Sequence, residues 1–217
     1  MTEKKSFDVD CPSCGCQGKF ITYNKIDINE NPELRDKIFN REIFMFNCDE
    51  CNEKFMIAYN TVYIDRENKY ALALITDGSN GFSGDGITIG EYDLRIVRTV
   101  NSFIEKITLF EDGIDDRVAE LLKLWLYENF ETQTKSKAVA IFYGGRIPET
   151  DQLKFFFIGE ENSSMETEIS MESYRNILEH FQGSEFDKKE ECEIDNDWAL
   201  LALRDGVFNY VAEDDEE

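Results

Sequence analysis

CPSCGC, residues 11–16, and CDEC, residues 48–51, hold five of the six cysteines of this chain. Each contains a Cys-x-x-Cys pair, and 33 residues lie between Cys14 and Cys48. Four thiolates in two such pairs close a tetrahedral zinc site and leave no position for water or substrate. The sequence therefore predicts one structural Zn²⁺ per chain, bound by Cys11, Cys14, Cys48 and Cys51.

The residues after each pair suit a tight turn that presents two sulfurs to one ion. Gly15 accepts positive φ without steric cost, and Asn52 is the next most tolerant residue type. Strand-like runs follow at residues 19–23 and 55–59. This order predicts a zinc-ribbon-like β module. A helix at residues 32–41 is expected as an insertion, begun by a capping Asn31 and by Pro32 at its first position.

The two remaining cysteines are expected to stay out of the metal site. Cys16 lies one residue past Gly15, and a Cys-x-Cys step does not easily give both sulfurs to an ion that Cys11 also binds. Cys192 has no nearby cysteine and is expected as a free thiol. A thioredoxin-like role is disfavoured, because GCQGKF is a poor helix start. A redox iron centre with the same four thiolates stays open.

The charge is strongly negative and uneven. The net charge is −23, and residues 1–75 carry 10 basic and 13 acidic side chains against 13 and 33 in residues 76–217. Phosphate binding needs clustered Lys and Arg, so the second part is a poor nucleic-acid surface. In the near-neutral first part, a nucleic-acid-binding ribbon remains the alternative. It would use Lys19 and Lys54 for phosphate, with bases stacked on aromatic side chains, namely Tyr23, Phe55 and Tyr59.

The chain has no run of about 18 apolar residues, and its first ten residues lack the apolar stretch of a secretory signal. We therefore expect no membrane association and a cytoplasmic protein, in which thiols stay reduced.

The fold class expected for the whole chain is α+β. Two apolar stripes at helical spacing predict a helical hairpin over 94–110 and 115–130; they comprise Val97, Val100, Ile104, Ile107 and Phe110, then Val118, Leu121, Leu122, Trp125, Leu126 and Phe130. Two strands are expected within residues 138–159. The predicted modules are the ribbon at 1–76, a Gly-rich connection at 77–90, the hairpin at 91–131, a β-hairpin with helices at 132–210 and an acidic tail at 211–217.

Two C-terminal helices are also expected. Ser170 caps the first, which Gly183 closes and whose apolar face is Tyr174, Ile177, Leu178 and Phe181. The second lies within residues 196–206, and a short strand is expected at 207–211.

Few residues indicate an enzyme. His180 lies off the apolar stripe of its helix, so a solvated position is expected rather than a catalytic base. Asp115, Asp116 and Glu120 form the only carboxylate cluster considered for a metal-dependent hydrolase. Acids in the first turn of a helix are more simply explained by the positive end of its dipole.

The string Cys-Pro-Ser-Cys-Gly, then Asn-Pro-Glu-Leu-Arg, a second cysteine pair and VYID resembles the CpXC-domain proteins of bacteria and archaea. The resemblance covers roughly residues 8–130 and implies that the four cysteines are the family's four. One departure is Asp49, where the family often has Pro. The resemblance supports the metal site and adds no activity. We therefore expect a non-enzymatic binding or adaptor protein with an unidentified protein partner.

Overall fold

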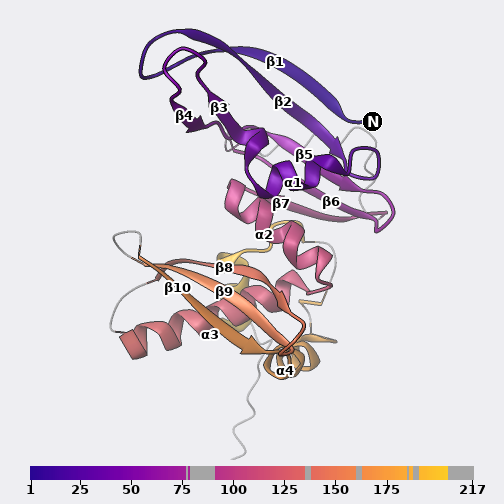
Figure 1. Ribbon diagram of the computed structural model, residues 1–217. Coiled ribbons are helices and arrows are strands. Elements are labelled where there is room, and N and C mark those ends of the chain that lie inside the picture. The colour runs from indigo at the N-terminus through magenta and orange to yellow at the C-terminus, as the bar shows by residue number, and fades with distance from the viewer. Residues whose placement is uncertain are drawn as a thin grey trace, which may run out of the picture. The chain divides into compact units, whose positions relative to one another are not determined.

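The computed structural model describes residues 1–76, 78, 91–134, 138–159, 163–184, 186–187 and 191–204. The chain forms two compact units, Met1–Ile104 and Glu105–Glu217. Each unit combines helices and strands (Figure 1), so the expected α+β class is confirmed.

A five-stranded sheet in the order β1-β2-β5-β6-β7 organises the first unit. Its strands are β1 Glu3–Asp10, β2 Gln17–Asp27, β5 Thr61–Asp65, β6 Tyr70–Leu74 and β7 Asp93–Val97. All five residues of β6, YALAL, are buried, as expected for an inner strand that is covered on both faces. The β2–β5 and β6–β7 pairs are parallel, and the other two are antiparallel.

Both cysteine motifs lie at the ends of β-hairpins. CPSCGC joins β1 to β2, and CDEC joins β3 Met45–Asn47 to β4 Lys54–Met56. The first strand, β1, was not predicted. Most of its residues are exposed, and its polar sequence EKKSFDVD gives no alternating apolar signal. β3 and β4 form a separate two-stranded sheet, shown under the end of the β1–β2 hairpin in Figure 1.

The predicted helical insertion is present as α1 Glu33–Phe39, followed by the short helix η1 Glu42–Phe44. Pro32 already has helical φ and ψ of −61° and −25°. The prediction that Asn31 caps the helix is wrong in detail, because Pro32 occupies the N-cap position and no side chain caps the helix. The Asn31 side-chain amide donates instead to the Glu33 carboxylate (3.2 Å). The helix buries Leu34 and Ile38.

The helix predicted over 94–110 is wrong in its first part. Residues Asp93–Val97 form β7, which pairs with β6, and α2 Val100–Glu111 begins only after a turn. The hydroxyl of Thr99 accepts a hydrogen bond from Ser102 N–H (3.1 Å) at the start of α2. Val97 was counted in the helical stripe, whereas it is a buried strand residue.

The Gly-rich segment predicted as a connection at 77–90 lies between β6 and β7, which are neighbours in one sheet. Residues 77 and 79–90 are outside the described residues.

A three-stranded antiparallel sheet in the order β10-β9-β8 organises the second unit. The predicted pair of strands is confirmed as β8 Ala138–Ile147 and β9 Gln152–Gly159, and β10 Ser164–Ser170 was missed. Its helices are α3 Asp116–Thr134, α4 Met171–Phe181 and α5 Asn196–Arg204. These helices and the sheet share one core, which includes Val118, Leu122, Phe155, Phe157, Tyr174, Phe181 and Trp198.

The helices of this unit follow the prediction with one clear exception. Ser170 caps α4 by accepting from Ser173 N–H (3.2 Å), and Gly183 ends it at φ +81°. On α3, Trp125 was expected in the core and is 51% exposed, while Leu124 is buried instead. The strand expected at 207–211 and the tail at 211–217 are outside the described residues.

Candidate metal centre

The two cysteine turns have the same backbone geometry. In the first, Cys11 N–H donates to Cys16 C=O (2.9 Å) and Gly15 N–H donates to Cys11 C=O (2.8 Å). In the second, Cys48 N–H donates to Glu53 C=O and Asn52 N–H to Cys48 C=O, both at 2.9 Å. Gly15 and Asn52 have φ of +74° and +60°. These are the left-handed positions that the sequence predicts, for the residue types that tolerate them best.

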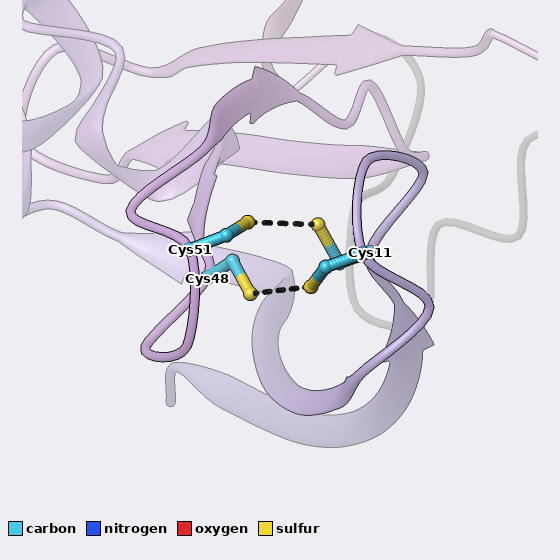
Figure 2. Close-up of side chains that lie close together, drawn as sticks. Cys11, Cys48 and Cys51 are labelled. Atoms are coloured by element: carbon cyan, nitrogen blue, oxygen red, sulfur yellow. Dashed lines mark hydrogen bonds between the residues drawn. The ribbon is translucent and has the colours of Figure 1, made fainter.

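The turns bring four sulfurs together from opposite sides (Figure 2). Cys11 Sγ lies 3.6 Å from Cys51 Sγ, and Cys14 Sγ lies 3.7 Å from Cys48 Sγ. All four sulfurs lie within 4.8 Å of one another. A tetrahedral ion with Zn–S bonds of about 2.3 Å spaces its sulfurs by about 3.8 Å. The distances therefore match ligands that share one ion, and they are much too long for disulfides.

A small core of its own supports the cluster. Cys11 and Cys48, the first cysteine of each pair, are buried with Phe20 and Phe46, whereas Cys14 and Cys51 are exposed. Val9, Phe55, Ile57 and Tyr59 pack around this core. Each turn thus anchors one cysteine in apolar packing and leaves the other near solvent.

The Cys51 thiol resists ionisation when no cation lies beside it. The backbone N–H of Glu53 lowers the pKa of the Cys51 thiol, but Cys14, partial desolvation, Cys11 and Cys48 raise it, so that the pKa is raised to about 12. A bound cation reverses this balance, because it stabilises thiolates and displaces their protons.

Cys16 lies outside the group of four sulfurs. It is exposed, and its carbonyl closes the first turn in the way that the Glu53 carbonyl closes the second. Glu53 is not a thiol, so the matching position in the second turn supplies no ligand. This equivalence agrees with the prediction that Cys16 is a spectator.

The aromatic residues considered for base stacking pack within the module. Tyr59 accepts a hydrogen bond from Tyr23 N–H (3.2 Å) and donates to Ile43 C=O (3.3 Å). Burial raises the pKa of Tyr59. The Phe55 ring lies 5.0 Å from that of Phe46. Lys19, considered for phosphate, forms an ion pair with Asp8.

The carboxylates considered for a hydrolase all have cationic partners. Asp115 binds the Arg117 guanidinium through both oxygens (2.9 and 2.6 Å). Lys106 Nζ lies 2.9 Å from Asp116 and 3.2 Å from Glu120. Within the described residues, the cysteine cluster is the one group of metal-ligating side chains that the geometry brings together. His180 is exposed, and its Nδ1 lies 2.6 Å from Asn176 C=O.

A buried charge network that was not predicted from the sequence links α2 to α3. Lys123 Nζ lies 3.1 Å from Glu105 and 2.9 Å from Glu120, and Glu120 also contacts Lys106. None of these four residues is more than 7% exposed. Glu105 also accepts from Tyr143 N–H (2.7 Å). A signal was present, because Glu120 and Lys123 lie among the buried Leu121, Leu122 and Leu124.

No described helix is long and apolar enough to cross a membrane. No curated protein and no solved structure matches the chain significantly. The sequence profile of the CpXC protein family matches residues 9–123, which is more than half of the chain and includes all four clustered cysteines. The chain therefore belongs to the CpXC protein family.

Proposed function

We propose that the chain binds one structural Zn²⁺ through Cys11, Cys14, Cys48 and Cys51, and that its first unit is a zinc-ribbon-like module. The supporting observation is the group of four sulfurs, all within 4.8 Å of one another on two matching turns. Four cysteines complete a tetrahedral coordination shell, so the ion has no position at which to activate water. Its role is therefore to fold the module.

We further propose that the protein acts in the cytoplasm as a non-enzymatic binding or adaptor protein. A reducing compartment keeps six cysteines available as thiols, and none of them forms a disulfide. The acidic cluster gives little support to a hydrolase, because its carboxylates are paired with Lys and Arg.

The nucleic-acid alternative has little support from the site. Its stacking residues pack within the module, and the net charge of −23 repels phosphate. We expect no tight binding of the full chain to generic DNA or RNA near physiological salt. Binding with a steep salt dependence would favour the alternative.

Two measurements test the proposal. Elemental analysis of protein purified without added metal should give one zinc per chain and no colour, whereas a red protein would mean iron. Affinity capture of the full chain followed by mass spectrometry, with and without a chelator, then tests binding. A partner that is retained only by the metal-loaded chain supports an adaptor with a structural metal. A partner retained equally after metal loss would contradict the metal's role in binding.

A further inference from the structure

A groove of about 390 Å³ lies between β2 and β3 in the first unit. Lys19, Ile21 and Tyr23 line it from β2, and Met45 and Asn47 line it from β3. β2 pairs with β5 only through Lys25–Asp27, and β3 pairs only with β4. The groove therefore separates strand segments that are each paired on one side only.

The backbone of β2 points into the open side at alternate residues. Tyr23 N–H donates to the Tyr59 hydroxyl (3.2 Å), and Tyr23 C=O accepts from the Thr61 hydroxyl (2.5 Å), so both groups face away from β1. Backbone groups in an antiparallel pair alternate in direction. Ile21 and Lys19 therefore point the same way as Tyr23, toward the open side.

The backbone of β3 is arranged in the same manner. The bonds from Cys48 N–H to Glu53 C=O and from Ile57 N–H to Phe44 C=O fix which residues face β4. Met45 and Asn47 have the opposite phase and point away from β4. Met45 N–H is bonded to Glu42 C=O.

The hydroxyls of Tyr59 and Thr61 bond the outward N–H and C=O of Tyr23. The β2 edge is open on the side of Tyr23 that leads toward the first cysteine turn. In the described part of the chain, no protein group bonds the outward backbone groups of Ile21, Lys19 or Asn47. An open strand edge of this kind is a template for pairing with another extended chain.

We propose that this groove binds an extended segment of a partner protein by strand addition to β2. The inference rests on the proposed binding function and specifies the form of the partner. The open edge from Lys19 to Ile21 spans roughly 7 Å at about 3.3 Å per residue, which suits a segment of about three residues. Backbone hydrogen bonds supply the affinity, and side-chain contacts supply the specificity.

The lining indicates the chemistry of the segment. Ile21, 52% exposed, and Met45 offer apolar contact in the middle of the groove. Lys19, which follows the first cysteine turn, and Asp49, which lies within the second, supply one pair of opposite charges. Lys37 and Glu42 supply another. With both signs present, the groove favours an apolar central side chain with polar or charged flanks.

The test uses the metal-loaded full chain and a displayed library of random dodecapeptides. The strongest selected peptide is labelled, and its affinity is measured by fluorescence anisotropy. Ile21→Asp places a charge in the groove and removes apolar contact. Phe7→Asp is the matched control, because Phe7 is 50% exposed on β1 and does not line the groove. Zinc content and amide protection confirm that both variants fold.

Strand addition predicts that Ile21→Asp weakens binding by about tenfold or more, whereas Phe7→Asp changes it by less than about twofold. Methylation of alternate peptide nitrogens should abolish binding, and the amide resonances of Ile21 and Asn47 should shift.

The inference would be overturned by no enrichment of any peptide, by loss of binding in Phe7→Asp but not in Ile21→Asp, or by full affinity of the N-methylated peptides. A peptide that needs the metal but binds elsewhere would overturn the groove and leave the proposed binding function standing.

Discussion

At the residue scale, the central distinction is between the four clustered cysteines and Cys16. Cys14→Ser should release zinc, because it removes one of four ligands from a closed shell. Cys16→Ser should keep one zinc per chain and an unchanged melting temperature, because its position matches the non-ligating Glu53. Metal content by elemental analysis distinguishes the two. Equal release of zinc from both variants would mean that the ligand set is wrong.

Gly18 tests the packing behind the cysteine turns. A Cβ at this position would lie 2.6 Å from Cζ of Phe46, which is fully buried beside the cluster. Gly18→Ala should therefore destabilise the first unit by about 1–3 kcal/mol through overpacking. Gly15→Ala is a contrasting variant, because nothing lies within 4 Å and only its positive φ is strained. The free energy of unfolding in urea measures both, and a Gly18→Ala protein as stable as wild type would contradict this packing.

At the element scale, the network of Glu105, Lys106, Glu120 and Lys123 holds α2 against α3. Lys123→Met leaves two buried carboxylates short of a cation, and breaking such a pair costs about 3–5 kcal/mol. Lys154→Met is the matched control, because Lys154 pairs with Glu166 on the surface, where an ion pair contributes less than about 1 kcal/mol. Urea unfolding monitored in the second unit should show a larger loss of unfolding free energy for Lys123→Met than for Lys154→Met. Similar small losses in both variants would mean that the network contributes little to stability.

The same network predicts a loss of stability at alkaline pH. Burial lowers the pKa of Lys123, but Glu105 and Glu120 outweigh burial, so the pKa is raised above the ordinary value of 10.5. The pKa of Lys106 is raised in the same way by Asp116 and Glu120. A raised lysine pKa stabilises the fold fully below pH 10.5, and this contribution is lost as pH rises through the raised pKa. The melting temperature of wild type should therefore fall more steeply above pH 10.5 than that of Lys123→Met.

Elements were predictable from sequence where a local signal agreed with the tertiary environment. Gly15, Asn52, Ser170 and Gly183 each mark a turn or cap by a backbone preference that acts locally, and all four are as predicted. Strands β1 and β10 were missed, because both are polar and mostly exposed and so lack an alternating apolar signal. Strand β7 was missed because it was read as the start of a helix. Residues 93–97 contain apolar residues at a spacing compatible with a helix. They form a strand because they pair in parallel with β6.

At the scale of the whole molecule, the cysteine cluster was predictable from the sequence. Equal spacing within both pairs identifies the four residues that the structure brings together. The boundary between compact units lies within α2, after Ile104, where the composition does not change. The charge network was missed for a related reason, because lysine and glutamate are usually solvated and only three-dimensional pairing shows them buried.

We propose that a metal held by four cysteines folds the cysteine-bearing end of the first unit. Metal affinity at such a site is on the order of 10–16 kcal/mol, comparable to the stability of a whole domain. The core around the cysteines is small, with Phe20 and Phe46 as its other buried members. By contrast, β6 is buried along its whole length and belongs to a larger sheet.

Amide hydrogen exchange measured by mass spectrometry before and after chelation tests this claim most directly, with metal loss verified by elemental analysis. Protection should disappear in residues 9–20 and 45–56 and persist in β5, β6 and the second unit, and Cys48→Ser should reproduce this pattern. If residues 45–56 stay protected in chain that has lost its metal, then the four cysteines do not depend on an ion for their fold, and the account is wrong.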